Sequence, residues 1–167
     1  MDGLADVSPA AFREAMARYP TGVTVVTTRG AGHEPYGFTA STFCSVSLDP
    51  PLVLVCLSRD AASMPAFRGC DRFAINVLRE DQIALAVRFA TRRPDKFDTD
   101  EVAGNGLLTV REAVAVFDCR VFARHEAGDH LIIIGEVRRL ASTDRPPAIY
   151  VDREFCGLRQ SASVGSA

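Results

Sequence analysis

Five Ser and Thr hydroxyls fall within the nine residues 39–47, among neighbours that favour β-strands and burial. They are Thr39, Ser41, Thr42, Ser45 and Ser47. A buried hydroxyl group costs free energy unless it finds a hydrogen-bond partner, and a bound ligand can be that partner. We therefore expect something polar to bind along this segment.

His130 is a candidate site residue because it follows Asp129 at the start of a predicted hairpin strand. A histidine there can project into a cleft and change its charge near neutral pH. It can equally be an exposed loop histidine, and the pattern leaves both interpretations open.

The loop triplet Asp95-Lys96-Phe97 is a second ambiguous candidate. Lys96 could neutralise a phosphate while Phe97 packs on an aromatic ring. Alternatively the pair is a solvated charge and a loop anchor, which the pattern alone favours. Weaker candidates of the same kind are Arg59 after a buried strand, Arg88-Phe89 at a helix end, and Asp152-Arg153.

Several common catalytic motifs are missing from the sequence. There is no GxxxxGK loop, no HExxH motif and no GxSxG nucleophile elbow. Gly30-Ala31-Gly32 begins like a dinucleotide fingerprint, but Pro35 occupies the third glycine position, so a hairpin turn is the better interpretation. The three histidines have no clustered partner ligands, which predicts no metal site. The five cysteines are widely spaced and are expected to be reduced.

Length and composition predict one ordinary domain. The chain has 167 residues, 47% of them hydrophobic, and a formal net charge of -2 with dispersed basic residues, so we expect no nucleic-acid partner. The acidic start of the chain lacks the features of a secretory signal, and the longest apolar runs are too short to span a bilayer. We expect a cytoplasmic protein without a membrane partner.

The elements that must position the candidate residues are mostly strands. Apolar or alternating runs predict strands at 23–28, from Tyr36, at 52–57, 73–78, 114–124, 131–137 and 148–151, and helices at 10–18, 63–67 and 81–90. Residues 91–110 are expected to form an irregular excursion. Because strands and helices do not alternate, we predict a mainly β fold, a small antiparallel barrel of about six strands with capping helices.

Five blocks in one order resemble a known family. They are Tyr19 to Thr27, Gly37 to Pro51, Phe73 to Leu78, Arg88-Phe89-Ala90 with Asp95-Lys96-Phe97, and Gly128-Asp129-His130 with Gly135-Glu136-Val137. The chain resembles the flavin reductase-like domain family, the short-chain reductases that supply reduced flavin to two-component monooxygenases. Actinomycete reductases of antibiotic biosynthesis look closest, with a similar ending at Ile149 to Arg153.

The resemblance implies an FMN-binding split β-barrel over residues 1–160, a homodimer, and a disordered tail at 161–167. It implies NADH-dependent reduction of FAD or FMN, with NADPH a weaker candidate and the reduced flavin released to a partner monooxygenase. His130 would face the nicotinamide. The residues expected to hold the flavin are Phe38, Thr39, Ala40, Ser41, Thr42, Ser45, Cys56, Leu57, Ser58, Arg59, Ser63, Asn76, Phe89, Lys96, Phe97, Tyr150 and Arg153.

Two other interpretations stay open from the residues alone. One is a pyridoxamine phosphate oxidase-like enzyme on a related barrel, which should carry more basic phosphate ligands than this chain offers. The other is a non-catalytic flavin-binding module whose strands only dimerise. Flavin-dependent oxidation of NADH separates both from a reductase. Hydride transfer between two stacked rings needs positioning and electrostatics but no protein nucleophile, which agrees with the missing catalytic motifs.

Overall fold

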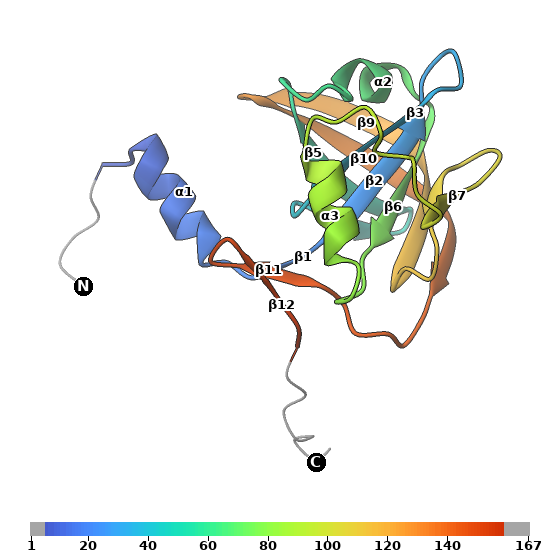
Figure 1. Ribbon diagram of the computed structural model, residues 1–167. Coiled ribbons are helices and arrows are strands. Elements are labelled where there is room, and N and C mark those ends of the chain that lie inside the picture. The colour runs from blue at the N-terminus through green and yellow to red at the C-terminus, as the bar shows by residue number, and fades with distance from the viewer. Residues whose placement is uncertain (1–5, 159–167) are drawn as a thin grey trace.

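The computed structural model describes residues 6–158, which form three helices and twelve strands (Figure 1). Seven strands form one antiparallel sheet in the order β3-β2-β6-β9-β10-β5-β4. Its strands are β2 (Thr24–Arg29), β3 (Pro35–Ala40), β4 (Cys44–Leu48), β5 (Pro51–Ser58), β6 (Arg72–Val77), β9 (Ala115–Ala127) and β10 (His130–Ser142). The prediction of a mainly β, antiparallel protein is confirmed.

A long hairpin of β9 and β10 forms the centre of this sheet. Gly128, with a φ of 57°, lies in the turn between the two strands, a conformation that glycine adopts without a steric penalty. The register shifts between Ile134 and Gly135 and again between Val137 and Arg139, where bulges bend the hairpin. This hairpin confirms the prediction from the alternating pattern, and its turn places His130 at the start of β10.

Two hydrophobic clusters hold the sheet and its helices together. One lies inside the curved sheet and includes Phe67 of α2 (Met64–Gly69) against Phe38 of β3, with ring centroids 5.0 Å apart. The other lies under α3 (Ile83–Ala90), where Leu85 and Phe89 are buried against residues that include Val25 of β2. No helix among residues 6–158 is long and apolar enough to cross a membrane.

The expected number of about six strands is wrong, because short strands escape sequence patterns. β7 (Val102–Ala103) and β8 (Thr109–Val110) form a two-stranded sheet inside the stretch expected to be irregular. β4 was not predicted as a separate strand. It lies at the edge of the main sheet, and most of its residues are exposed, so the expectation of burial for residues 39–47 is wrong over 44–47.

The N-terminal helix and a small sheet stand apart from this body (Figure 1). α1 (Pro9–Ala17) begins as predicted, with the Ser8 hydroxyl accepting a hydrogen bond from the Ala11 amide. β1 (Thr21–Gly22) pairs with β11 (Ile149–Val151), which pairs with β12 (Glu154–Cys156). None of the residues of α1 is buried in the single chain, and we call this helix the N-terminal arm.

Asp118 of β9 accepts hydrogen bonds from two arginines on the neighbouring strands. Its side chain is 8% exposed, and Arg72 and Arg139 approach its carboxylate to 2.8 and 2.7 Å. Burial opposes ionisation of Asp118, but the hydrogen bonds from both arginines outweigh burial and hold its pKa below the ordinary value.

Asp118→Asn is expected to lower the free energy of unfolding by about 2 kcal/mol at neutral pH, because a buried charge pair loses its anion while both arginines are partly solvated. Since the folded pKa is depressed, this stabilisation is present above the unfolded pKa of about 4 and disappears as the pH falls through the folded pKa. Urea unfolding at pH 7 and pH 3 measures both effects. The control Glu136→Gln removes the more exposed Arg138 pair and should cost under about 1 kcal/mol. Equal stability of Asp118→Asn and the native chain at pH 7 would contradict the assignment.

Candidate active site

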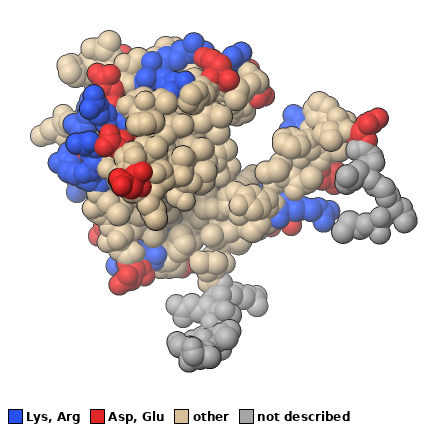
Figure 2. All heavy atoms as spheres, turned by 180° about the vertical axis from the view of Figure 1, so that it is seen from behind, with Lys and Arg blue, Asp and Glu red and all other residues tan. Residues whose placement is uncertain are grey.

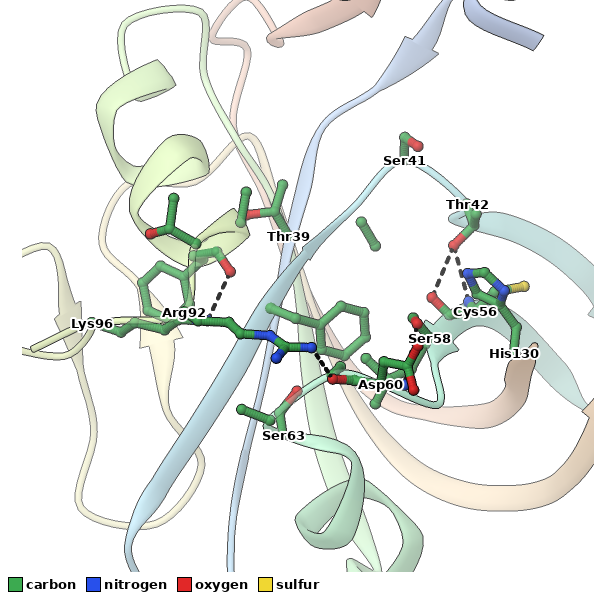
Figure 3. A pocket seen from close by; sticks show the side chains of 18 residues that line it. Thr39, Ser41, Thr42, Cys56, Ser58, Asp60, Ser63, Arg92, Lys96 and His130 are labelled. Carbon is green, nitrogen blue, oxygen red and sulfur yellow. Dashed lines mark hydrogen bonds between the residues drawn. The ribbon is translucent and has the colours of Figure 1, made fainter. Parts of the chain in front are cut away.

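A hollow of about 380 Å³ opens at the end of β3 and faces β5, the loop after β5 and the end of α3 (Figure 3). We call it the main hollow. Its walls combine strand residues with the segments that precede α2 and follow α3. Its lining residues are Phe38, Thr39, Ala40, Ser41, Thr42, Cys56, Leu57, Ser58, Asp60, Ala61, Ala62, Ser63, Phe89, Ala90, Thr91, Arg92, Lys96 and His130.

Two cations lie at one end of the main hollow. Arg92 donates from Nη2 to the Asp60 carbonyl oxygen at 2.6 Å. Lys96 donates from Nζ to the carbonyl oxygen of Phe89 at 3.0 Å, and burial lowers the pKa of its ammonium. The Ser63 hydroxyl faces the same end and makes no capping hydrogen bond to α2, so it can bind a ligand.

The cationic end fits an anionic group such as a phosphate. Arg92 and Lys96 contribute two positive charges to the lining, against one negative charge from Asp60. A partly desolvated ammonium and a planar guanidinium both form strong hydrogen bonds to phosphate oxygens. This donor set therefore suits the phosphate of a nucleotide, with the Asp60 carboxylate opposing part of the attraction.

The opposite end of the main hollow carries His130, Thr42 and Cys56 (Figure 3). His130 pairs in register with Ser58 across β10 and β5, and its Nδ1 lies 2.7 Å from a carboxylate oxygen of Asp129. That hydrogen bond lowers the pKa of Asp129 and leaves the other ring nitrogen, Nε2, free for a ligand. The imidazole therefore presents one ring nitrogen to a ligand at this end while the Asp129 carboxylate holds the other.

The Cys56 thiol is a poor nucleophile in this setting. Burial raises its pKa above the ordinary value of 9.0, so it remains a thiol at neutral pH. The neighbouring Thr42 hydroxyl accepts a hydrogen bond from the Cys56 amide at 2.9 Å. The end of the hollow near His130 therefore offers positioning and proton exchange, without an activated thiolate.

Close packing of α3 on β3 fixes the wall of the hollow. A Cβ atom at Gly37 would lie 2.7 Å from the Phe89 ring, so only glycine permits this approach. The Thr39 hydroxyl donates to the Ala86 carbonyl oxygen at 2.6 Å, and Phe97 packs edge-on against Phe89 with ring centroids 5.0 Å apart. These contacts hold α3 and the loop that carries Lys96 against the strand.

The structure brings twelve of the expected site residues into the lining of the main hollow. They are Phe38, Thr39, Ala40, Ser41, Thr42, Cys56, Leu57, Ser58, Ser63, Phe89, Lys96 and His130. The hydroxyl segment does reach the hollow, although Thr39 and Thr42 already have protein partners for their hydroxyl groups. The sequence suggested that a ligand supplies the hydrogen-bond partners of these hydroxyl groups. For Thr39 and Thr42 the protein itself supplies them.

The other expected residues lie outside this lining. Ser45 is exposed on β4, and Arg59 forms an ion pair of 2.7 Å with Glu126. Asn76 is fully buried, and its amide group bonds to backbone atoms of β2 and β8. Phe97 packs edge-on against Phe89 and does not itself line the main hollow. Tyr150 and Arg153 line a second, adjoining hollow.

Arg92 is the charged lining residue that the sequence analysis missed. It follows the predicted helix and, with Thr91, lies at the start of the stretch expected to be irregular. The other lining residues that were not named individually are Asp60, Ala61, Ala62 and Ala90. The only signal was the Arg92-Arg93 pair beside a helix end, and Arg93 instead forms a 2.5 Å ion pair with Asp95.

Comparison with known proteins agrees with this geometry. Residues 16–159 match the flavin reductase like domain model. The chain is 49% identical to the actinorhodin polyketide dimerase of Streptomyces coelicolor over 92% of this chain and 88% of the relative. It is 38% identical to the reductase component of 4-hydroxyphenylacetate 3-monooxygenase from Thermus thermophilus, over 87% of this chain and 93% of the relative.

A solved structure has the same fold. It is the NADH:FAD oxidoreductase SgcE6 of Streptomyces globisporus, in complex with NAD and FAD fragments. The identity is 35%, the TM-score is 0.88, and the match covers 96% of this chain and 100% of that chain. The resemblance found in the sequence is confirmed, and the chain belongs to the flavin reductase like domain family.

Proposed function

We propose that the protein is an NADH:flavin oxidoreductase that reduces FAD or FMN and releases the reduced flavin to a partner monooxygenase. The observation that carries this proposal is the main hollow, with two cations at one end, His130 at the other and no activated nucleophile. The names of the relatives support it, since they include an NADH:FAD oxidoreductase and a monooxygenase reductase component. A relative named for a polyketide supports a role in secondary metabolism.

The residues of the main hollow favour one orientation of a bound flavin. The flavin phosphate would lie at Arg92, Lys96 and Ser63, where the cations gather. The ring would lie along the walls formed by β3 and β5, toward Thr42 and Cys56. Ala40 and Leu57 contribute apolar surface to these walls, and Thr42 and Ser58 contribute hydroxyl groups. NADH would then approach from the His130 end.

The chain contributes binding and orientation to this reaction. When bound, the flavin supplies the hydride-accepting chemistry, and NADH is the donor. Arg92 and Lys96 hold the phosphate, while the strand walls hold the ring plane and exclude water from one side. His130, restrained through Nδ1 by Asp129, orients the nicotinamide or moves a proton at Nε2.

A steady-state assay tests the proposal. Purified protein, NADH and an excess of FAD or FMN should consume NADH, measured by its nicotinamide absorbance, and NADH loss should be slow when flavin or protein is omitted. Flavin binding without NADH oxidation would instead indicate the non-catalytic module. Oxidation of pyridoxamine phosphate in place of NADH would indicate the pyridoxamine phosphate oxidase-like alternative.

We also propose that residues 1–160 belong to one split-barrel domain. In the described part of the chain, β3 and β4 are the two edge strands of the seven-stranded sheet. Residues 161–167, expected to be a tail, lie outside the described part of the chain. A cytoplasmic location and the absence of nucleic-acid and membrane partners remain predictions from the sequence.

A homodimer accounts for the N-terminal arm. Phe12 and Met16 on the arm and Tyr19 just after it form an apolar stripe, and each is more than half exposed. A nine-residue helix is marginal in water without packing, so a stripe of this kind needs a surface to cover it. On the face seen in Figure 2, the surface beside the arm is largely free of charged side chains, which suits apolar contact with a second copy.

Phe12→Asp combined with Met16→Asp is expected to shift the protein from twice the 18.1 kDa chain mass to that mass. Two buried anions would oppose burial of the stripe. Light scattering after gel filtration measures the mass. Glu14→Lys, on the opposite side of the same helix, should leave the mass unchanged. A native protein that already has the mass of one chain would contradict the dimer.

A further inference from the structure

A second hollow of about 300 Å³ adjoins the main one, and the proposed function leaves it unused. We call it the adjoining hollow. Its lining residues are Val23, Thr39, Ala40, Ser41, Val87, Ala90, Thr91, Tyr150, Arg153 and Phe155. Five of these, Thr39, Ala40, Ser41, Ala90 and Thr91, also line the main hollow, so the two spaces share one wall.

The lining of the adjoining hollow suits a flat, uncharged ring. Tyr150 and Phe155 pack with ring centroids 5.0 Å apart at an angle of 57°, and Val23 and Val87 add aliphatic surface. Arg153 is the only charged residue among the ten that line it. Arg153 lies in the turn between β11 and β12 with a φ of 65°. Aromatic side chains and one arginine are the groups on which nucleobases stack.

We infer that the adjoining hollow binds the adenosine half of FAD and makes the protein select FAD over FMN. This inference rests on the proposed function, which places the flavin in the main hollow with its phosphate near Arg92. FAD extends beyond that phosphate by a second phosphate and adenosine. Thr91 lines both hollows and directly precedes Arg92, so the added group can enter the adjoining hollow from the phosphate end.

The positions of the two ends favour FAD over NADH as the source of this adenosine. In Figure 3, His130 lies at the opposite end of the main hollow from Arg92 and Lys96. If the nicotinamide lies beside His130, the remainder of the NADH molecule enters the main hollow from the His130 end. The flavin phosphate lies on the other side, next to Thr91, where the two hollows meet. Because they also share Ser41, beside Thr42, the experiment below measures the KM for NADH as well as flavin affinity.

Two variants of the adjoining hollow test the inference. Val87 is 48% exposed on α3, so Val87→Glu places a charge in the hollow without disturbing the core. Tyr150→Ala removes one ring of the aromatic pair. Leu140→Glu, at a residue 60% exposed on β10 and away from both linings, is the matched control.

The readout is the ratio of the dissociation constants for FMN and FAD, measured by flavin fluorescence without NADH. The native protein should bind FAD about tenfold more tightly than FMN, because stacking of one base contributes this much. Val87→Glu and Tyr150→Ala should bring the ratio close to one, and Leu140→Glu should leave it unchanged. A ratio near one in the native protein, or the same ratio in all variants, would overturn the inference. So would a rise in the KM for NADH with an unchanged FAD affinity.

This experiment separates the inference from the proposed function. Selective FAD binding by a protein that does not oxidise NADH would support the adenosine site and contradict the reductase. NADH oxidation by a native protein whose FAD and FMN affinities are equal would support the reductase and overturn the adenosine site.

Discussion

Lys96→Ala is expected to weaken the binding of FAD and FMN by about thirtyfold, because a charge-assisted hydrogen bond to phosphate contributes about 2 kcal/mol. The ammonium is a strong phosphate partner here. Burial partly desolvates it and lowers its pKa, and it donates hydrogen bonds to the carbonyl oxygens of Phe89 and Gly37. Titration of flavin fluorescence in the absence of NADH measures the change.

Riboflavin, which has no phosphate, is the decisive control for Lys96. Its affinity should be nearly the same in the native protein and in Lys96→Ala. Arg93 belongs to the same loop, but it pairs with Asp95 and does not line the main hollow. Arg93→Ala should therefore leave flavin affinity unchanged. If Lys96→Ala weakened riboflavin as much as FMN, the lysine would support the loop and not the phosphate.

His130→Ala is expected to slow flavin reduction by NADH by about a hundredfold while changing the dissociation constant of the flavin less than about twofold. The imidazole lies at the opposite end of the hollow from the phosphate cations and is held by Asp129. Its loss should therefore affect the nicotinamide step. Single-turnover rates at saturating flavin, over a series of NADH concentrations, separate the rate from the binding of NADH.

The matched control for His130 is His125→Ala, in the same hairpin. His125 pairs in register with Ile132 and is not part of the hollow, so its removal should leave the reduction rate unchanged. A weaker flavin affinity in His130→Ala, with a normal reduction rate, would place His130 on the flavin and not on the nicotinamide.

The long strands were predictable because each buries a regular set of side chains. The alternation at 114–124 and the apolar run at 52–57 indicated β9 and β5, and Ser8-Pro9 marked the start of α1. β4 could not be read in this way. It is an exposed edge strand with a register shift between Ser45 and Ser47, so it has no clean period of two. Strands of two residues, such as β1 and β7, contain too few positions for any period.

The lining of the main hollow was predictable where it consists of consecutive residues. Residues 38–42 and 56–58 are such stretches, and all of them line the main hollow. Single side chains were harder, since alternate residues of a strand point to opposite faces. Asn76 faces the core for this reason, and Ser45 lies beyond the hollow on β4. The position of Arg92 depends on how α3 packs on Gly37, which no local pattern reports.

In the proposed reaction, this chain passes a hydride from NADH to a flavin held in the main hollow. The decisive measurement is anaerobic mixing of the protein with equal amounts of NADH and FAD, monitored by the visible absorbance of oxidised flavin. This absorbance should disappear as one NADH is consumed per flavin, and the reaction should require the protein. The reduced flavin should then pass through a membrane that retains the protein. Oxidised flavin that persists on the protein in the presence of NADH would rule out this reaction.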